Sequence, residues 1–347
     1  MAYQHGVTEE QIRSVLAQVR YPGFSRDIVS FGLVKDIRID GSDVTVALEI
    51  TAKDTSIPET IRQNVEDALQ ALSGIGQVVV NLDVRTPTPN PSAAAPGPTP
   101  IEGVKKVIAV ASGKGGVGKS TIAVNLAIAL AQTGAKDGLC DCDIYGPSVA
   151  LMLGSREPLM ATENDRIIPI EAHGIKTMSM GYVLGEHSPA VMRGPRVTST
   201  TQQLLRQVEW GELDYLILDL PPGTGDIQLT IIQTVTLAGA VLITTPQEVA
   251  LLDVRKAAAM FGKVNVKLLG VIENMSYFLC PDNGKRYDIF GSGGGAREAE
   301  RMKTPLLAEI PIDIATREGG DHGMPIVIAN PQSPVSQAFK AAAAALL

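Results

Sequence analysis

The sequence predicts an α/β fold in which a doubly wound, mostly parallel sheet is preceded by a small α+β domain. Short apolar runs beyond residue 103 alternate with helical stretches, and several of these runs are unbroken. Strands that crossover helices bury on both faces have this character. A glycine-rich segment joins the first of these runs to a helical stretch, and a proline-rich segment separates the first 85 residues from the rest.

Residues 1–85 are expected to fold as the small α+β domain. The first helical stretch opens on a Thr-x-x-Gln capping box, and the sequence Asp40-Gly-Ser-Asp43 lies between two runs that are expected to pair as a hairpin. The predicted elements are a helix at 8–20, strands at 29–39 and 44–50, a helix at 57–72 and a strand at 77–84.

Residues 86–103 are expected to form a linker, because proline and small residues dominate there and no apolar periodicity could build a core. The larger domain then spans 104–347. Its predicted strands are 107–111, 138–141, 175–178, 215–218, 240–244, 268–272 and 306–310. The Ala-rich stretch 334–347 is expected to close this domain as a packed helix.

Composition narrows the class of protein. A length of 347 residues suggests two domains at about 150 residues each. The net charge of −7 argues against broad affinity for nucleic acid or an anionic membrane. The amino terminus lacks the pattern of a secretory signal, and no stretch reaches the ~18 apolar residues of a membrane span, so a cytoplasmic protein is expected. Three cysteines are too few for a disulfide framework.

The strongest motif is Gly113-Lys114-Gly115-Gly116-Val117-Gly118-Lys119-Ser120, which fits G-x-x-x-x-G-K-[ST] between a predicted strand and a predicted helix at 121–132. Glycines let backbone N–H groups surround phosphate oxygens, and Lys119 supplies a cation near the β and γ oxygens. Ser120 offers a hydroxyl to Mg²⁺, and Thr121 can help to hold the nucleotide. The motif predicts a P-loop NTPase that binds Mg·ATP.

Two other interpretations fit the same glycines. Gly113, Gly115 and Gly118 also satisfy the G-x-G-x-x-G pattern of a dinucleotide fold, with Asp141 at about the distance of its ribose acid. A purely structural glycine-rich turn is the other. The Lys-Ser pair that ends the motif is unnecessary in a dinucleotide fold, and a Walker-B-like run ends downstream at Asp219, where an acid can address Mg²⁺. Both features favour the P-loop.

Two acidic segments follow predicted strands. Asp141 and Asp143 end the second strand of the larger domain, and Asp143 is the candidate that orients water in line with the γ-phosphate. The alternative is an acid that caps the next turn. The sequence Asp219-Leu-Pro-Pro-Gly-Thr-Gly-Asp226 predicts either a switch loop that senses the γ-phosphate or a rigid turn before a helix at 227–236.

Two lysines in one P-loop, Lys114 and Lys119, form the deviant Walker A pattern, and the chain here resembles the family of Mrp/ApbC proteins, ParA/MinD and the nitrogenase iron protein. Further motifs are similar to those of the Mrp/ApbC iron–sulfur carriers. These are Asp141-Cys-Asp-Ile-Tyr-Gly-Pro-Ser148, Met192-Arg-Gly-Pro195, Asp219-Leu-Pro-Pro-Gly-Thr-Gly-Asp226, Glu273-Asn-Met-Ser276 and Ile289-Phe-Gly-Ser-Gly-Gly-Gly295. The first 85 residues are similar to the small iron–sulfur-assembly domain that is often fused ahead of such ATPases.

The resemblance assigns roles to single residues. Lys114 is implied to reach the nucleotide of a partner subunit, so an ATP-linked homodimer is expected; the alternative is a solvated lysine. Lys114, Lys119 and Asp143 are the implied catalytic residues. Asp219 is implied to contact Mg²⁺ through water. The adenine is implied to lie against Asn274, Pro311 and Asp313.

Carriers that this chain resembles hold a [4Fe-4S] cluster between two subunits, each of which contributes a Cys-x-x-Cys pair. The matching segment here is Cys280-Pro281-Asp282-Asn283, so one thiolate stands where two are expected. Asp282 or an exogenous thiol would complete the ligand set, or Cys280 is an ordinary loop cysteine. The small domain has Ser56 where relatives commonly carry a reactive cysteine.

Cys140 and Cys142 lie two residues apart on a predicted strand, so their side chains could face one metal ion. Burial as small core residues is the favoured alternative.

The leading hypothesis is an ATP-hydrolysing homodimer that assists iron–sulfur cluster assembly or transfer, with donor proteins and recipient apoproteins as partners. The alternative of a different class is an ATP-dependent regulator or scaffold that binds no cluster. A partition ATPase would need DNA or membrane binding, which the acidic charge disfavours. A reductase like the nitrogenase iron protein would also need two cluster thiolates per subunit.

Overall fold

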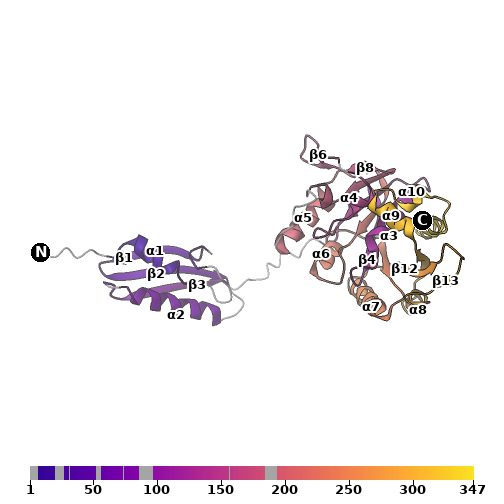
Figure 1. Cartoon of the computed structure of the whole chain (residues 1–347). Coiled ribbons are helices and arrows are strands. Elements are labelled where there is room, and N and C mark those ends of the chain that lie inside the picture. Colours follow the sequence, from indigo (N-terminus) through magenta and orange to yellow (C-terminus); the bar gives the residue numbers. More distant parts are fainter. Residues whose placement is uncertain are drawn as a thin grey trace. The chain divides into compact units, whose positions relative to one another are not determined.

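The computed structural model describes residues 7–19, 27–30, 32–51, 56–72, 74–85, 97–155, 157–183 and 194–347. The chain divides into two compact units, Met1–Ala95 and Pro96–Leu347 (Figure 1). The domain boundaries expected from the sequence, 85/86 and 103/104, stay predictions.

The smaller unit is an α+β fold. Its elements are α1 (Glu9–Leu16), β1 (Val34–Asp40), β2 (Asp43–Thr51), α2 (Ser56–Gln70) and β3 (Val78–Arg85). The sheet order is β1-β2-β3, with β1 antiparallel and β3 parallel to β2. Alternate residues of β2, from Val44 to Ile50, are buried in one core with residues of both helices. Both helices therefore cover the same face of the sheet, and the predicted capping box is present at Thr8 and Gln11.

One predicted strand of this unit is wrong at its start. The sequence pattern predicts a start at Val29, but β1 begins at Val34 and residues 28–30 form a turn. The Asp27 carboxylate accepts hydrogen bonds from the backbone N–H groups of Val29 (3.0 Å) and Ser30 (2.8 Å). This side-chain cap competes with strand pairing, so apolar content alone misjudged the segment.

Among the described residues, the larger unit contains a nine-stranded sheet in the order β13-β12-β11-β4-β10-β5-β9-β8, with β14 also paired to β12. The strands are β4 (Val104–Ser112), β5 (Asp137–Asp141), β8 (Ile170–Ala172), β9 (Ile175–Met178), β10 (Leu213–Asp219), β11 (Gly239–Thr244), β12 (Leu268–Leu279), β13 (Arg286–Tyr287) and β14 (Leu306–Ile312). Seven are mutually parallel, and these are the seven strands that the apolar runs predict; β8 and β13 pair antiparallel.

Helices cover both faces of this sheet. They are α3 (Lys119–Ala131), α4 (Val149–Met152), α5 (Gly194–Arg206), α6 (Asp226–Thr234), α7 (Glu248–Lys263), α8 (Gly294–Arg301), α9 (Ile314–Asp321), α10 (Ile326–Ala329) and α11 (Pro334–Ala344), with a 3-10 turn at Met180–Tyr182. Ile108 and Val110 of β4 share one core with α3 and α11, whereas Ala109 and Ala111 share the other with α6 and α7. The doubly wound fold class is thus confirmed, and the tail helix is packed as predicted.

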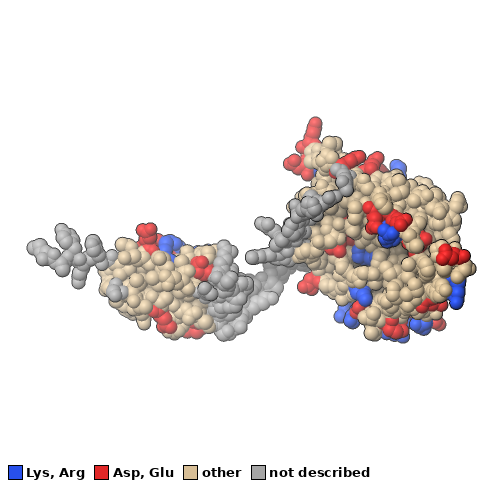
Figure 2. All heavy atoms as spheres, in the orientation of Figure 1, with Lys and Arg blue, Asp and Glu red and all other residues tan. Residues whose placement is uncertain are grey.

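Residues 97–103 pack on the larger unit. Thr99 pairs with the α6–β11 connection through bonds to Thr234 and Thr236, and Ile101 is buried in the core on the α6 and α7 side. The remaining elements are a small hairpin of β6 (Met160–Ala161) and β7 (Ile167–Ile168). Acidic side chains gather near β6, and charges of both signs are interspersed over the rest of the visible face (Figure 2). No helix in the described ranges has the length and apolar character needed to cross a membrane.

Candidate functional site

The glycine-rich segment curls between the end of β4 at Ser112 and the start of α3 at Lys119. Gly116 and Gly118 have φ values of 80° and 79°, in the left-handed region that glycine adopts readily. No side chain caps the start of α3. Its first N–H groups and the positive end of the helix dipole are therefore free to bind an anion.

Two of the glycines are required by close packing. A Cβ at Gly113 would overlap the backbone of Asp253 in α7, and a Cβ at Gly118 would overlap the amide of Asn274 in β12. The Asn274 amide in turn donates a 2.8 Å hydrogen bond to the carbonyl of Val117. The loop is held between α7 and β12, so its backbone is positioned before any ligand binds.

The Lys119 cation of the P-loop and the Asp219 carboxylate at the end of β10 form a buried ion pair. The Lys119 ammonium contacts a carboxylate oxygen of Asp219, with side-chain exposures of 7% and 0%, and lies 3.3 Å from the Ser120 hydroxyl. The other carboxylate oxygen of Asp219, Oδ2, is buried and has no hydrogen-bond partner among the described residues. The Asp219 carboxylate and the Ser120 hydroxyl both contact the same ammonium, and both are hard oxygen donors of the kind that Mg²⁺ binds. These residues therefore fit the metal that the motif predicts.

Asp141 of β5 is the direct register partner of Asp219 in the neighbouring strand β10. Burial, and then the charge of Asp219, raise the pKa of the Asp141 carboxyl to about 7. Opposing this shift, the carboxylate accepts hydrogen bonds from the Ser179 hydroxyl (2.9 Å) and from the backbone N–H groups of Asp143, Ser148 and Val149. Asp141 thus organises the segment that carries Asp143.

Asp143 lines the cavity in front of the P-loop. Its carboxylate also accepts a 3.2 Å hydrogen bond from the N–H of Gly146. Both interpretations offered by the sequence therefore have a structural counterpart: the acid caps the local turn and faces the phosphate-binding cavity.

The P-loop cavity has a volume of about 230 Å³. Its lining combines the P-loop with the segment after β5 and the loop after β10. It consists of Ser112, Lys114, Gly115, Gly116, Val117, Gly118, Lys119, Ser120, Thr121, Asp143, Ser148, Met152 and Pro222. The lining includes two lysines and the hydroxyl residues of the P-loop, which are the cationic and donor groups that phosphate binding requires.

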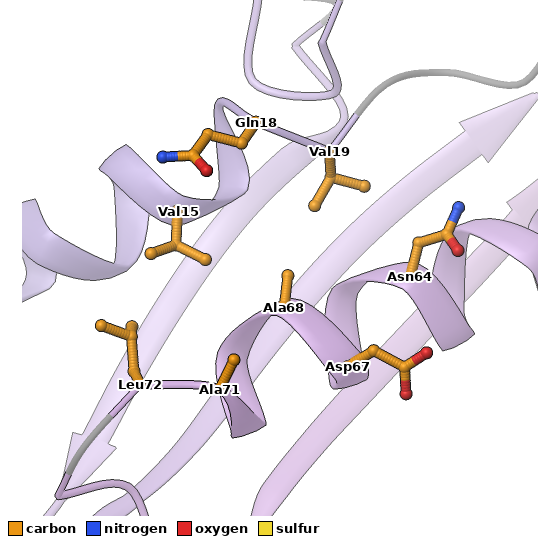
Figure 3. Close-up of a pocket in the computed structure, with 8 residues that line it drawn as sticks. All are labelled: Val15, Gln18, Val19, Asn64, Asp67, Ala68, Ala71 and Leu72. Atoms are coloured by element: carbon orange, nitrogen blue, oxygen red, sulfur yellow. The ribbon is translucent and has the colours of Figure 1, made fainter.

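A larger hollow of about 580 Å³ lies in the smaller unit, between α1 and α2 (Figure 3). Its walls are Val15, Gln18, Val19, Asn64, Asp67, Ala68, Ala71 and Leu72. None of these is a lysine or arginine, so this hollow lacks the cation that a phosphate ligand needs.

The residues expected at the adenine are not brought into the P-loop cavity. Asn274 is 7% exposed, is not among the lining residues, and donates a hydrogen bond to the carbonyl of Val117. Pro311 lies in β14, and Asp313 caps α9 by accepting hydrogen bonds from the N–H (2.7 Å) and hydroxyl (2.6 Å) of Thr316. Their adenine role stays a prediction.

Comparison with known proteins decides the family. The family model described as "NUBPL iron-transfer P-loop NTPase" matches residues 103–347, and the model "Iron-sulfur cluster assembly protein" matches residues 9–82. The chain belongs to the NUBPL-type iron-transfer P-loop NTPases. The resemblance drawn from the sequence motifs is therefore confirmed for both parts of the chain.

Curated relatives of this NUBPL-type chain match over nearly its full length. An iron–sulfur cluster carrier protein of Synechocystis is 43% identical over 342 residues, covering 97% of this chain and 96% of the relative. One of Deinococcus radiodurans is 45% identical over 332 residues, covering 95% and 92%.

Solved structures agree with the fold of the larger unit. The nucleotide-binding protein of Archaeoglobus fulgidus in complex with ADP aligns with a TM-score of 0.60 at 36% identity, covering 68% of this chain and 92% of that one. The cell-division ATPase MinD of Pyrococcus furiosus aligns with a TM-score of 0.55 at 27% identity, covering 70% and 98%.

In this NUBPL-type chain, Cys280 lies apart from the P-loop, at the hairpin between β12 and β13. Its N–H donates to the carbonyl of Lys285 (2.9 Å), and its carbonyl accepts from the N–H of Gly284 (2.8 Å). The thiol is half-buried and Asp282 is exposed. The described residues contain no group of three or more His, Cys, Asp or Glu side chains that could hold a metal ion.

Cys140 and Cys142 are fully buried, and their sulfur atoms are 3.9 Å apart. The hydrogen bond to Cys140, together with burial, raises the pKa of the Cys142 thiol well above its usual range. The structure thus favours the core role for this pair. Met192 and Arg193 lie outside the described residues, as does the side chain of Ser56, which is the first residue of α2.

Sequence reasoning missed several neighbours of the P-loop. Met152 and Pro222 line the cavity, and Ser179 supports Asp141. Pro222 belongs to a loop that the sequence did single out, but Ser179 is 38 residues away from Asp141 and no motif links the two.

Proposed function

We propose that this chain is an ATP-binding and ATP-hydrolysing homodimer that assists the assembly of iron–sulfur clusters or their transfer to apoproteins. The observation that carries the ATPase part is the buried Lys119–Asp219 pair at a P-loop preformed between α7 and β12. Similarity to curated iron–sulfur cluster carrier proteins over nearly the whole chain supports the carrier part.

The chain's own residues supply most of the hydrolytic machinery. Lys119 exchanges Asp219 for phosphate oxygens when nucleotide binds, and the N–H groups at the start of α3 bind the same phosphates. Mg²⁺, when bound, neutralises phosphate charge, and Ser120 and Asp219 would hold it. Asp143, at the cavity wall, orients the attacking water.

Lys114 is proposed to serve the homodimer. It lines the P-loop cavity, and its ammonium forms no ion pair with a described residue. A lysine that forms no ion pair within its own subunit can contact the nucleotide bound by a second copy of the chain. A cytoplasmic location is part of the same proposal, as is the absence of nucleic-acid and membrane partners.

The cluster is cargo in this account, and Cys280 is the proposed thiolate ligand. Two copies of the chain supply two such thiolates, so Asp282 or an exogenous thiol completes a [4Fe-4S] ligand set. The smaller unit is proposed to contact the donor and recipient proteins.

Measurement of ATP turnover tests the enzymatic part. The wild-type chain is expected to release phosphate slowly, and both Lys119→Ala and Asp143→Asn are expected to lower kcat by at least roughly a hundredfold. Lys105→Ala is the matched control, because Lys105 is an exposed lysine of β4 paired with Asp214. Equal turnover by Lys119→Ala and Lys105→Ala would refute an ATPase centred on this P-loop.

The second candidate is an ATP-dependent regulator or scaffold without a cluster, and the single thiol of Cys280-Pro-Asp-Asn favours it. Cys280→Ala separates the two functions. The carrier predicts that cluster delivery to an apoprotein is lost while ATP turnover is kept. The scaffold predicts that Cys280→Ala changes neither activity while Lys119→Ala abolishes function.

A further inference from the structure

Gln228 is hydrogen-bonded to the loop that follows Asp219. It is the third residue of α6, it is 1% exposed, and its Nε2 donates a hydrogen bond to the carbonyl of Pro221. The next residue, Pro222, lines the P-loop cavity, 3.9 Å from the position that a Cβ at Gly115 would take. The Gln228 amide thus holds the loop one residue before it reaches the nucleotide cavity.

The carbonyl oxygen of the Gln228 amide, Oε1, is buried and has no hydrogen-bond donor among the described residues. A buried carbonyl oxygen without a donor is costly, so its persistence calls for an explanation. A glutamine at the third position of a helix commonly accepts from the N–H of the N-cap residue. Here the N-cap is Gly225, and no side chain caps the helix.

A second hydrogen bond fixes the same loop two residues further along, at Gly223. The N–H of Gly223 donates to the carbonyl of Ser112 at the end of β4 (3.2 Å), and Gly223 has a φ of 94°. The loop is therefore fixed to the P-loop strand at Gly223 and to α6 at Pro221. A rearrangement that frees Pro221 leaves Gln228 able to bond Gly225 instead.

We propose that Gln228 is a positioning residue that gives this loop two alternative arrangements. In one, shown by the structure, its Nε2 holds Pro221. In the other, its Oε1 accepts the N–H of Gly225, so one hydrogen bond replaces another as Pro222 moves with the occupancy of the cavity. This inference rests on the proposed ATP hydrolysis for its catalytic consequence, and it makes the loop a switch instead of a rigid turn.

Hydrogen exchange and ATP kinetics on Gln228→Met test the proposal. Methionine keeps the volume and removes both hydrogen-bonding groups. Exchange at the amides of Gly223, Thr224 and Gly225 in the nucleotide-free protein is expected to speed up roughly tenfold. The kcat for ATP is expected to fall roughly tenfold with the KM for ATP changed less than about twofold, because the phosphate-binding groups are untouched.

Ile232→Val, a conservative change at another buried position of α6, is the matched control. It is expected to leave exchange at the three amides and the kcat unchanged. Unchanged amide exchange in Gln228→Met, or changes in both variants that merely follow their lost stability, would overturn the positioning role. Hydrogen exchange does not require ATP turnover. A wild-type chain without ATPase activity would therefore refute the proposed function, and the exchange measurement would still decide the role of Gln228.

Discussion

The Lys119–Asp219 pair places two opposite charges in a buried part of the nucleotide site. Removal of one member of a buried pair leaves the other charge without compensation. Lys119→Met is therefore expected to lower the free energy of unfolding of the nucleotide-free protein by about 3–5 kcal/mol. Urea denaturation measures this loss. The double variant Lys119→Met/Asp219→Leu should recover much of it, and a single-variant loss below about 1 kcal/mol would contradict a buried charge pair.

Asp137 is a buried acid whose carboxylate is only partly compensated by hydrogen bonds. It is 2% exposed, one carboxylate oxygen has no partner among the described residues, and burial raises its pKa well above 3.8. Between pH 3.8 and this raised pKa the folded chain holds a proton that the unfolded chain has released, so stability falls as pH rises through that window.

Asp137→Asn removes the titrating group and keeps an oxygen for the N–H of Gly138, which the carboxylate now accepts (2.7 Å). The free energy of unfolding of the variant is expected to equal that of wild type near pH 4. At pH 8 it is expected to exceed the wild-type value by on the order of 1–3 kcal/mol. Urea denaturation at both pH values measures the difference. A stability difference that does not depend on pH would show that Asp137 is not the titrating group.

At the residue scale, spacing alone located Lys119, Ser120 and Asp219, because a phosphate site needs those groups at fixed offsets from a strand. It did not locate Ser179 or Gln228. Each of these acts through a hydrogen bond to a partner that the fold positions, and no motif in the sequence signals the bond to Asp141 or the bond to Pro221.

At the element scale, the P-loop depends on how closely α7 approaches it. Gly113→Ala would push a Cβ into the backbone of Asp253, whereas Gly115→Ala would place one at an ordinary 3.9 Å from Pro222. Gly113→Ala is expected to cost about 1–3 kcal/mol of stability and to weaken ATP binding. Gly115→Ala is the matched control and should change the stability by less than about 0.5 kcal/mol. Thermal melts and nucleotide titration measure both, and similar losses in the two variants would argue against this packing.

The same scale shows what a hydrophobic pattern can predict. The central strands β4, β10 and β11 are buried on both faces over most of their length, so unbroken apolar runs predict them. The strands at β8 and β13 are three and two residues long, too short to carry a pattern. The turn before β1 is capped by the Asp27 side chain, and a count of apolar residues does not detect such a cap.

At the scale of the whole molecule, the motifs indicated the family because they recur along the larger unit, from the P-loop to the segment that ends at Gly295. The packing of residues 97–103 was harder to predict from the sequence. Proline predicts an extended backbone, but burial of Ile101 depends on a core surface that only the folded larger unit provides.

Anaerobic reconstitution with iron and sulfide, followed by iron counting and absorption spectroscopy, tests the carrier claim most directly. Wild type and Cys142→Ala, in which a buried core thiol is removed, are expected to bind a labile cluster, and Cys280→Ser is expected to lose it. A wild-type protein that binds no cluster would contradict the account and leave an ATP-dependent scaffold.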